Sequence, residues 1–268
     1  MIKPRHVIAG GLALLWWLTK PARRDEDMKA WQGLFSHRGL HDAQAPENTK
    51  AAFERSLSYG LGYEFDVQLT KDDQLVVHHD FDGRRSFKQT IRLDELSLSD
   101  LRQYRLFETN QTIMTLQELL KLTDGKVRLI LEIKTEKKAA YISSLVAEAL
   151  DDYSGEVVIE SFHPMVLWWF RRHRPNYLRG QLSYDSYRSE PSLRNFLLSN
   201  YFFNFLARPH FAAHAFEDRK HCGLRIQHWL HRTPLVVYTI KSQVDQRIAR
   251  QMFPTIIFED YLPEELDK

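Results

Sequence analysis

The 268-residue sequence has little cysteine, little net charge and no low-complexity stretch. Its single cysteine, Cys222, excludes an internal disulfide and a thiolate-rich zinc site, and we expect it to be a small buried apolar residue. Lys plus Arg (37) nearly balance Asp plus Glu (35), so the formal charge of +2 gives no general electrostatic reason for nucleic-acid binding. Nothing in the sequence points to a protein partner. Hydrophobic residues (43%) and charged residues (27%) are near globular averages, which excludes a disordered, collagen-like or coiled-coil chain.

Long hydrophobic runs are scarce too, and residues 7–18 (VIAGGLALLWWL) form a run unlike anything later in the chain. As a helix rising about 1.5 Å per residue, this run covers roughly 18 Å, less than the ~30 Å hydrocarbon core of a bilayer. The following TKPARRDED has no small-x-small cleavage site of a secretory signal. We therefore expect residues 1–25 to be an uncleaved membrane anchor and basic linker, with charged residues continuing to Lys29. Its membrane contacts would be Trp16 and Trp17 near the headgroups and Lys3, Arg5, Lys20, Arg23 and Arg24 on anionic lipid.

The alternative for the same run is an N-terminal helix packed on the folded body. Basic residues flank both ends, and their slight excess after the run weakly favours a cytoplasmic body. The sequence thus predicts membrane association but leaves its geometry open.

Residues 31–268 contain no internal repeat and no Pro/Gly/Ser linker, which indicates one continuous domain. Between its amphipathic stretches lie short strand-like runs at 33–36, 62–67, 127–133, 157–162, 178–183, 202–207, 235–240 and 255–258. The amphipathic stretches at 50–59, 138–151, 164–174 and 243–252 alternate with these runs, as in a parallel sheet with crossover helices. Eight such units in a chain of this length predict an α/β fold, the (β/α)8 TIM barrel.

A further strand-like run, 74–78, follows the strand ending near Val67 too closely for a crossover helix, so we expect an antiparallel hairpin. A turn centred on Asp72 and Asp73 would place Lys71 opposite Gln74 and, further along, Asp66 opposite His79. Residues 81–117 then form a small polar insertion with little strand character.

Carboxylates stand at two of the predicted strands, near the face of a parallel barrel where active sites gather. Glu64 and Asp66 are two residues apart and therefore share one face of a strand, where they would repel each other without a cation. Glu132 lies within an apolar strand-like run, where a charged side chain is costly unless it is paired or ligated. Three carboxylates without a thiolate favour a hard divalent ion, Mg2+ or Ca2+.

Histidines and cations accompany these carboxylates. His37 and His79 end separate elements, as expected of a general base and a general acid. Arg38 and Lys134 add fixed positive charge suited to a phosphate group.

Together the fragments HRGLH (from His37), PENT, EFDVQLTKDDQLVVHHD and LEIK resemble, in order and spacing, the pattern of the glycerophosphodiester phosphodiesterase family. The resemblance implies that His37 and His79 are the acid/base pair and that Arg38 and Lys134 hold the phosphate. It also implies Glu64, Asp66 and Glu132 as ligands of a divalent metal. We expect Glu47 of PENT to orient Arg38, Asn48 to cap the next helix, and Tyr238 to contact substrate or fill the barrel mouth.

The sequence departs from the family late in the chain. The usual Trp-Thr-Val-Asn is replaced by Tyr238-Thr239-Ile240-Lys241, and the closing Thr-Asp by Glu259-Asp260. We expect these departures to affect the leaving group and to leave the chemistry intact.

The family implies a metal-dependent phosphodiesterase that releases glycerol 3-phosphate from glycerophosphodiesters. The first nucleophile would be the glycerol hydroxyl next to the phosphate, although the residues alone equally allow direct attack by water. One alternative is a lysophospholipase D type enzyme acting on lysophospholipids in membranes. Another is a non-catalytic, membrane-tethered phosphate-binding protein, although binding alone would not require two proton-transfer groups.

Overall fold

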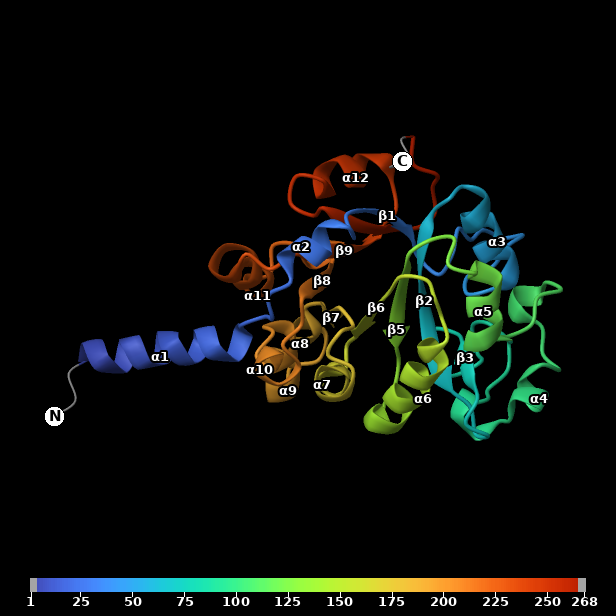
Figure 1. Cartoon of the computed structure of the whole chain (residues 1–268), viewed down its shortest axis with the longest axis horizontal. Helices are drawn as coiled ribbons and strands as arrows, with labels where there is room; N and C mark the ends of the chain where they lie inside the picture. The colour runs from blue at the N-terminus through green and yellow to red at the C-terminus, as the bar shows by residue number, and fades with distance from the viewer. Residues whose placement is uncertain (1–3, 265–268) are drawn as a thin grey trace.

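Eight parallel strands close into a barrel in the computed structural model, which describes residues 4–264 (Figure 1). The barrel closes because β1 pairs with both β10 and β2. Around it run β1 (Gly33–Ser36), β2 (Gly62–Leu69), β5 (Leu129–Ile133), β6 (Val157–Ser161), β7 (Arg179–Ser183), β8 (Phe211–Ala215), β9 (Leu235–Ile240) and β10 (Thr255–Phe258). The predicted (β/α)8 barrel is confirmed. Residues 1–3 of the expected anchor, which include Lys3, and residues 265–268 of the expected domain lie outside the described residues.

The alternation of side chains along each strand separates two cores. On β5, Leu129 and Leu131 join the cluster that contains Ile142 of α6 (Ala139–Asp151). Ile130 instead joins a cluster with Phe35 and other strand residues, as expected of the barrel interior. Glu132, two residues further on, shares the face of Ile130 and thus points into the barrel.

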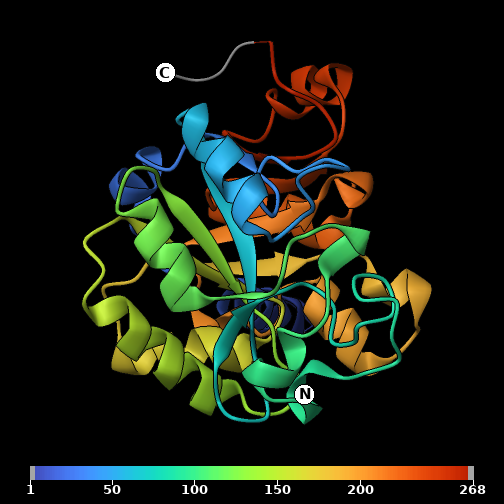
Figure 2. The same ribbon diagram turned by 90° about the vertical axis from the view of Figure 1, so that its right-hand side faces the viewer.

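Helices surround the strands, and the view in Figure 2 shows α3, α5 and the insertion on the side of the barrel opposite α1. The other helical segments are α2 (Asp25–Lys29), α3 (Lys50–Ser58), α5 (Leu116–Thr123), α7 (Pro164–His173), α8 (Ser186–Ser189), α9 (Leu193–Ser199), α10 (Asn204–Ala207), α11 (Cys222–Arg225), α12 (Gln243–Ala249), the 3-10 turn η3 (Phe216–Asp218) and the π-helix η4 (Ile226–His231).

One predicted strand is wrong. Residues 202–207 form a turn and the short helix α10, and the strand at this place in the barrel is β8. The predicted run FFNFLA has three aromatic residues and the observed strand FAAHA has one phenylalanine, so propensity alone selected the wrong segment. The prediction that Cys222 is buried is wrong as well, because this residue begins α11 and is exposed.

The hairpin exists with a register one residue from the prediction. β3 (Leu75–Val77) pairs antiparallel with the end of β2, placing Leu69 opposite Leu75 and Val67 opposite Val77. The amide of His78 donates to the carbonyl of Asp66 at 3.1 Å, so His78 occupies the place predicted for His79. The shift arises because Asp73 adopts φ +58°, which adds a third residue to the turn.

The insertion builds a small core of its own. It contains η1 (Leu93–Glu95), α4 (Leu98–Leu101), η2 (Leu106–Glu108) and β4 (Met114–Thr115), which pairs with β3. A separate apolar cluster holds these turns against Val76 of β3 and consists of Val76, Phe87, Leu93, Leu101, Leu106 and Ile113. The insertion is therefore anchored beside the end of β2, next to the carboxylates.

The N-terminal run is helical and extends away from the body. Helix α1 (Pro4–Thr19) contacts the body at its C-terminal end, where Thr19 is buried and Trp17 stacks on Phe205 with ring centroids 4.9 Å apart (Figure 1). Asn204 and Gln227 both donate to the Thr19 carbonyl. The alternative of a packed helix thus holds at this end, whereas the earlier turns are exposed. Within residues 4–264, no helix combines the length and hydropathy needed to cross a bilayer.

Candidate active site

Three buried carboxylates meet inside the barrel near the carboxyl ends of β2 and β5. Asp66 and Glu132 are register partners, and Glu64 lies two residues before Asp66 on the same face. One oxygen from each of the three lies within 4.8 Å of the others. Asp66 Oδ1 is buried and has no hydrogen-bond partner among the described residues. A donor set of three carboxylates with an unsatisfied oxygen fits a hard divalent cation.

The electrostatics of the three carboxylates reflect their confinement. Burial raises the pKa of Glu64 and of Glu132, and the charge of Asp66 adds to the rise in both. Burial acts in the same direction on Asp66, but His79, Lys134 and Arg38 outweigh it and hold its pKa below the ordinary value. Without another cation, like charges in this group are only partly compensated.

Lys134 supplies an amine to two of these carboxylates. It follows β5, and its Nζ lies 3.2 Å from Glu132 Oε1 and 3.6 Å from Asp66 Oδ1. The predicted phosphate ligand therefore lies at the carboxylate group, on the side of β5.

His37 and His79 both line a cavity of about 160 Å3, to which Glu64 and Glu132 also contribute. His37 follows β1, its Nδ1 donates to Glu259, and its Nε2 lies 3.7 Å from Glu64 Oε2. Burial and Arg38 lower the pKa of His37. The Nδ1 of His79 is 2.6 Å from Asp80 Oδ1. Because each ring binds a carboxylate through Nδ1, Nε2 is the nitrogen suited to proton transfer in both.

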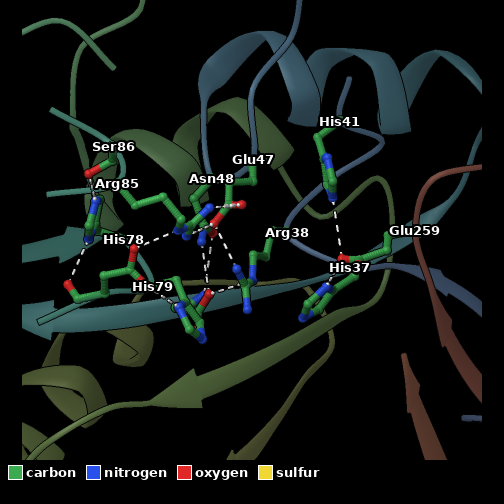
Figure 3. A network of polar contacts seen from close by, with 12 residues as sticks. His37, Arg38, His41, Glu47, Asn48, His78, His79, Arg85, Ser86 and Glu259 are labelled. Atoms are coloured by element: carbon green, nitrogen blue, oxygen red, sulfur yellow. Dashed lines mark hydrogen bonds and ion pairs between the residues drawn. The ribbon is translucent and has the colours of Figure 1, made fainter. Parts of the chain in front are cut away.

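Arg38 is held in place by hydrogen bonds to Glu64 of β2 and to Glu47 of the loop before α3 (Figure 3). It adopts φ +54°, its amide donates to Glu64 at 3.1 Å, and its Nη1 donates to Glu47 Oε1 at 2.7 Å. Glu47 also accepts two bonds from Arg85 of the insertion, at 2.6 and 2.7 Å. Despite burial, these two guanidinium groups lower the pKa of Glu47 to about 2. Arg85 was not predicted from the sequence, because it belongs to a segment without a recognisable motif.

His78 ties the insertion to the hairpin. It is buried, its ring stacks on Phe87 at 5.4 Å, and its nitrogens bond to Ser86 and to the Asp80 carbonyl (Figure 3). Burial lowers its pKa to about 4, so it stays neutral near pH 7. Of the two adjacent histidines, His79 lines the cavity and His78 supports the hairpin.

Asn48 is not the helix cap expected from the sequence. The cap of α3 is Thr49, whose side chain accepts from the Ala52 amide. Asn48 adopts φ +55° and donates through Nδ2 to Asp66 Oδ2 at 2.8 Å. The left-handed conformation, which asparagine tolerates well, turns its amide toward the carboxylates.

Two further acidic residues at the site were not predicted. Glu160 of β6 is the register partner of Glu132 and lines the same cavity, and its buried Oε2 has no hydrogen-bond partner within residues 4–264. Its signal was a glutamate inside the apolar run VVIESF, the same signal that identified Glu132. Glu259 contacts His37 through Nδ1, a contact that the sequence did not predict.

Tyr238 lies at the mouth of the barrel and lines the cavity that contains His37 and His79. Its hydroxyl donates to the Ser183 carbonyl at 2.8 Å, and its ring meets Phe162 edge to face at 6.2 Å. A second cavity of about 310 Å3 shares Glu132, Phe162 and Leu182 with the first and continues toward Tyr184 and Arg194.

Relatives of known fold resemble this architecture. The chain is similar to a phosphodiesterase from Oleispira antarctica in complex with the product sn-glycerol-3-phosphate, with a TM-score of 0.69 and 20% identity over 87% of this chain and 94% of the other. It is also similar to a glycerophosphodiester phosphodiesterase from Thermotoga maritima, with a TM-score of 0.65 and 22% identity over 84% of this chain and 93% of the other. At these identities the similarity establishes the shared fold.

Sequence relatives are closer over shorter stretches. A glycerophosphodiester phosphodiesterase from Bacillus altitudinis is 33% identical over 165 residues, which are 57% of this chain and 66% of the relative. A relative from Mycoplasma genitalium also matches this chain, and that match covers 47% of the relative's length. Residues 37–262, which include every motif described above, match the glycerophosphoryl diester phosphodiesterase family. The chain therefore belongs to that family.

Proposed function

We propose that the protein hydrolyses glycerophosphodiesters to glycerol 3-phosphate and an alcohol. The observation that carries this proposal is the single cavity in which His37 and His79 accompany Glu64 and Glu132. The family match and the product bound to the Oleispira antarctica neighbour support the same substrate class. A simple phosphate-binding protein would need the cations but neither histidine.

A divalent ion, Mg2+ or Ca2+, would be held by Glu64, Asp66 and Glu132 and would neutralise charge on the phosphodiester oxygens. Arg38 and Lys134 would bind the same phosphoryl group. Asn48 and Glu47 position these groups through Asp66 and Arg38, respectively.

In the first step, one histidine removes the proton from the glycerol hydroxyl next to the phosphate. The oxygen of that hydroxyl bonds to phosphorus, the bond from phosphorus to the leaving alcohol breaks, and the other histidine gives its proton to the departing oxygen. Water then opens the resulting cyclic phosphate with the two roles reversed. Direct attack by water is the alternative, and detection of a transient cyclic phosphate by 31P NMR decides between them.

The test is an activity panel of glycerophosphodiesters with the purified protein after chelation and after addition of Mg2+ or Ca2+. We expect release of glycerol 3-phosphate only with added metal. A nitrophenol leaving group needs no general acid, so the variant that lacks the acid should regain much of its rate on that substrate, whereas the variant that lacks the base should not. Binding of glycerophosphodiesters without turnover would contradict the proposal and support the non-catalytic alternative.

A second candidate is lysophospholipase D activity, favoured by the cavity beside the active site. Its wall includes the apolar side chains of Phe162, Leu182 and Leu198. A lysophospholipase D from Rattus norvegicus is 37% identical over 70 residues, 26% of this chain and 22% of the relative. Lysophospholipids in the same panel test this candidate, and faster turnover of lysophospholipids than of the deacylated diesters would favour it.

We also propose that α1 places the enzyme at a bilayer surface. Four of its apolar side chains, Val7, Ile8, Leu12 and Leu14, are at least 56% exposed. Helices that are apolar on all sides are ordinarily covered by protein or lipid. At the base of the helix, the Nζ of Lys20 lies 4.4 Å from the centroid of the Trp16 ring. An aromatic ring beside an ammonium group suits the headgroup region of a bilayer. A cytoplasmic body remains a prediction from the charge distribution, and protease protection in sealed vesicles tests it.

A further inference from the structure

Three adjacent barrel strands deliver three residues to one level of the barrel mouth. Ser36 of β1 pairs with Phe258 of β10, and Phe258 pairs with Ile240 of β9. The residues that follow these positions are His37, Glu259 and Lys241. Two of the three, Lys241 and Glu259, are departures from the family pattern noted above.

The departing residues contact each other and the histidine. Glu259 accepts through Oε2 from His37 Nδ1, and Lys241 Nζ lies 2.7 Å from Glu259 Oε1. His41 Nε2 lies 3.5 Å from the same Oε2, and Figure 3 shows both histidine rings directed at the Glu259 carboxylate. The side chains of His37 and Glu259 are each only 13% exposed. Both oxygens of Glu259 are therefore engaged, one by the imidazoles and one by the ammonium.

We propose that Glu259 is a positioning residue for His37, and that Lys241 holds Glu259 in place. A carboxylate on Nδ1 fixes the imidazole in the tautomer with its proton on Nδ1, so that Nε2 faces the reacting group as a proton acceptor. Where the family has Thr and Asn, this chain has an ion pair. The glutamate adds negative charge near Glu64, and the lysine neutralises it, so the two departures depend on each other.

This proposal rests on the proposed function, because it assigns His37 a proton-transfer role. A metal ion between His37, His41 and Glu259 is the competing interpretation, since their donor atoms lie within 4.8 Å of one another. The direct contact from His37 Nδ1 to Glu259 leaves no room for an ion between them, and Lys241 already neutralises the carboxylate through its other oxygen. The geometry therefore favours an imidazole–carboxylate pair.

The experiment compares Glu259→Thr and Glu259→Gln with a matched control, Asp260→Asn. Asp260 also faces Lys241, at 3.6 Å, but no contact joins it to His37 among the described residues. We expect Glu259→Thr to lower kcat about 10- to 100-fold with KM within about 2-fold, the range found when a group that orients a catalytic ligand is removed. Glu259→Gln keeps an acceptor for Nδ1 and should recover part of the rate, and Asp260→Asn should behave like the wild type.

Two further readouts separate positioning from a structural role. Nitrogen-15 NMR of His37 should show the proton on Nδ1 in the wild type and a mixture of tautomers in Glu259→Thr. Glu259→Thr should also cost nothing further in a His37→Ala background, because it acts through His37. Should Glu259→Thr fold poorly, the double variant Lys241→Asn/Glu259→Thr removes both charges together and should show the same kcat loss and tautomer change.

The outcomes distinguish failure of this proposal from failure of the proposed function, in which His37 transfers a proton. A fully active His37→Ala variant would overturn the catalytic role of His37. An inactive His37→Ala variant beside a Glu259→Thr variant with wild-type kcat would overturn only the positioning role. Stoichiometric Zn2+ or Mg2+ binding that is lost in both Glu259→Thr and His41→Ala would overturn it in favour of a second metal site.

Discussion

The mouth of the barrel and helix α1 depart from the usual distribution of side chains in opposite directions. At the mouth, Glu64, Asp66 and Glu160 are at most 2% exposed. Along α1, the apolar side chains of Ile8 and Leu12 are 64% and 63% exposed. Charge is buried in one region, and apolar surface is exposed in the other.

The difference identifies the partner that each region lacks. Buried carboxylates are costly in free energy unless they are paired or ligated. The basic side chains at the mouth neutralise only some of the carboxylates there, so the missing partner is a cation. Exposed apolar surface is costly in water, so α1 calls for an apolar environment. We therefore expect added metal to change the properties of the barrel mouth and not those of α1. Added lipid should bind to α1 and leave the barrel mouth unchanged.

The largest expected effect is at the carboxylates. Glu64→Gln should lower kcat on a glycerophosphodiester by about 1,000-fold, as expected when a major electrostatic contribution to the transition state is removed. The same variant should raise the Tm of the metal-free protein, because burial and Asp66 raise the pKa of Glu64 and the ionised group therefore destabilises the fold above its ordinary pKa. Kinetics and thermal unfolding after chelation check both. A metal-free Tm below that of the wild type would contradict the electrostatic argument.

The next effect concerns the two histidines. Replacing His37 or His79 with Ala should lower kcat about 100-fold or more while the fold survives, since general acid or base catalysis typically contributes this much. The matched control is His78→Gln, which changes the adjacent histidine that supports the hairpin. This variant should lower Tm, and it should change kcat far less than either Ala substitution does. Near wild-type kcat in both Ala variants would exclude proton transfer by these residues.

A smaller effect is expected at α1. Because Thr19 and the residues after it are bound to the body, the truncation should remove residues 1–14 and leave this contact intact. Binding to vesicles that contain anionic lipid should weaken at least ~10-fold, since several exposed apolar side chains are lost. Turnover of a water-soluble diester should not change.

The control for α1 is Val244→Ser, which alters an equally exposed apolar side chain on α12. It should leave vesicle binding at the wild-type level. Equal vesicle binding by the truncated and full-length proteins would refute the lipid assignment, and loss of self-association on truncation would assign α1 to a second copy of the chain instead.

The smallest effect is on acid stability and originates away from the mouth. Burial lowers the pKa of His214 to about 3, and the ring bonds to Tyr201 through Nδ1. As the pH falls below about 6.5, this histidine is protonated in the unfolded chain but stays neutral in the folded chain. The contribution of His214 to the free energy of unfolding is therefore complete above pH 6.5 and falls as the pH drops toward 3. His214→Gln should flatten this decline, by a few °C of Tm at pH 4.5. An unchanged acid profile would assign the decline to other groups.

The sequence predicted the barrel because its strands are short, apolar and separated by amphipathic helices. Seven of the eight predicted barrel strands coincide with observed ones, and the miss at 202–207 shows where propensity misleads. FAAHA forms β8 through its neighbours β7 and β9, which is tertiary information. The hairpin register failed for a local reason, the left-handed Asp73, which adds one residue to the turn.

The candidate site divides in the same way. Glu64 and Asp66 could be predicted because their spacing along one strand makes them share a face, and Glu132 because a charged residue within an apolar run needs a partner. Arg85 and Glu259 could not, because a loop in the insertion and the last strand meet the motif residues only after the barrel closes. Asn48 was assigned to a helix cap because the sequence does not show which of two adjacent polar residues takes that position.

The central claim is that Glu64, Asp66 and Glu132 hold a divalent cation. Calorimetric titration of the chelated protein with Mg2+ and with Ca2+ tests it most directly, with wild type and Asp66→Asn side by side. The account predicts one saturable site per chain in the wild type for at least one of the two ions, and loss of that site in Asp66→Asn. Absence of binding in the wild type, or equal binding by the two proteins, would contradict it.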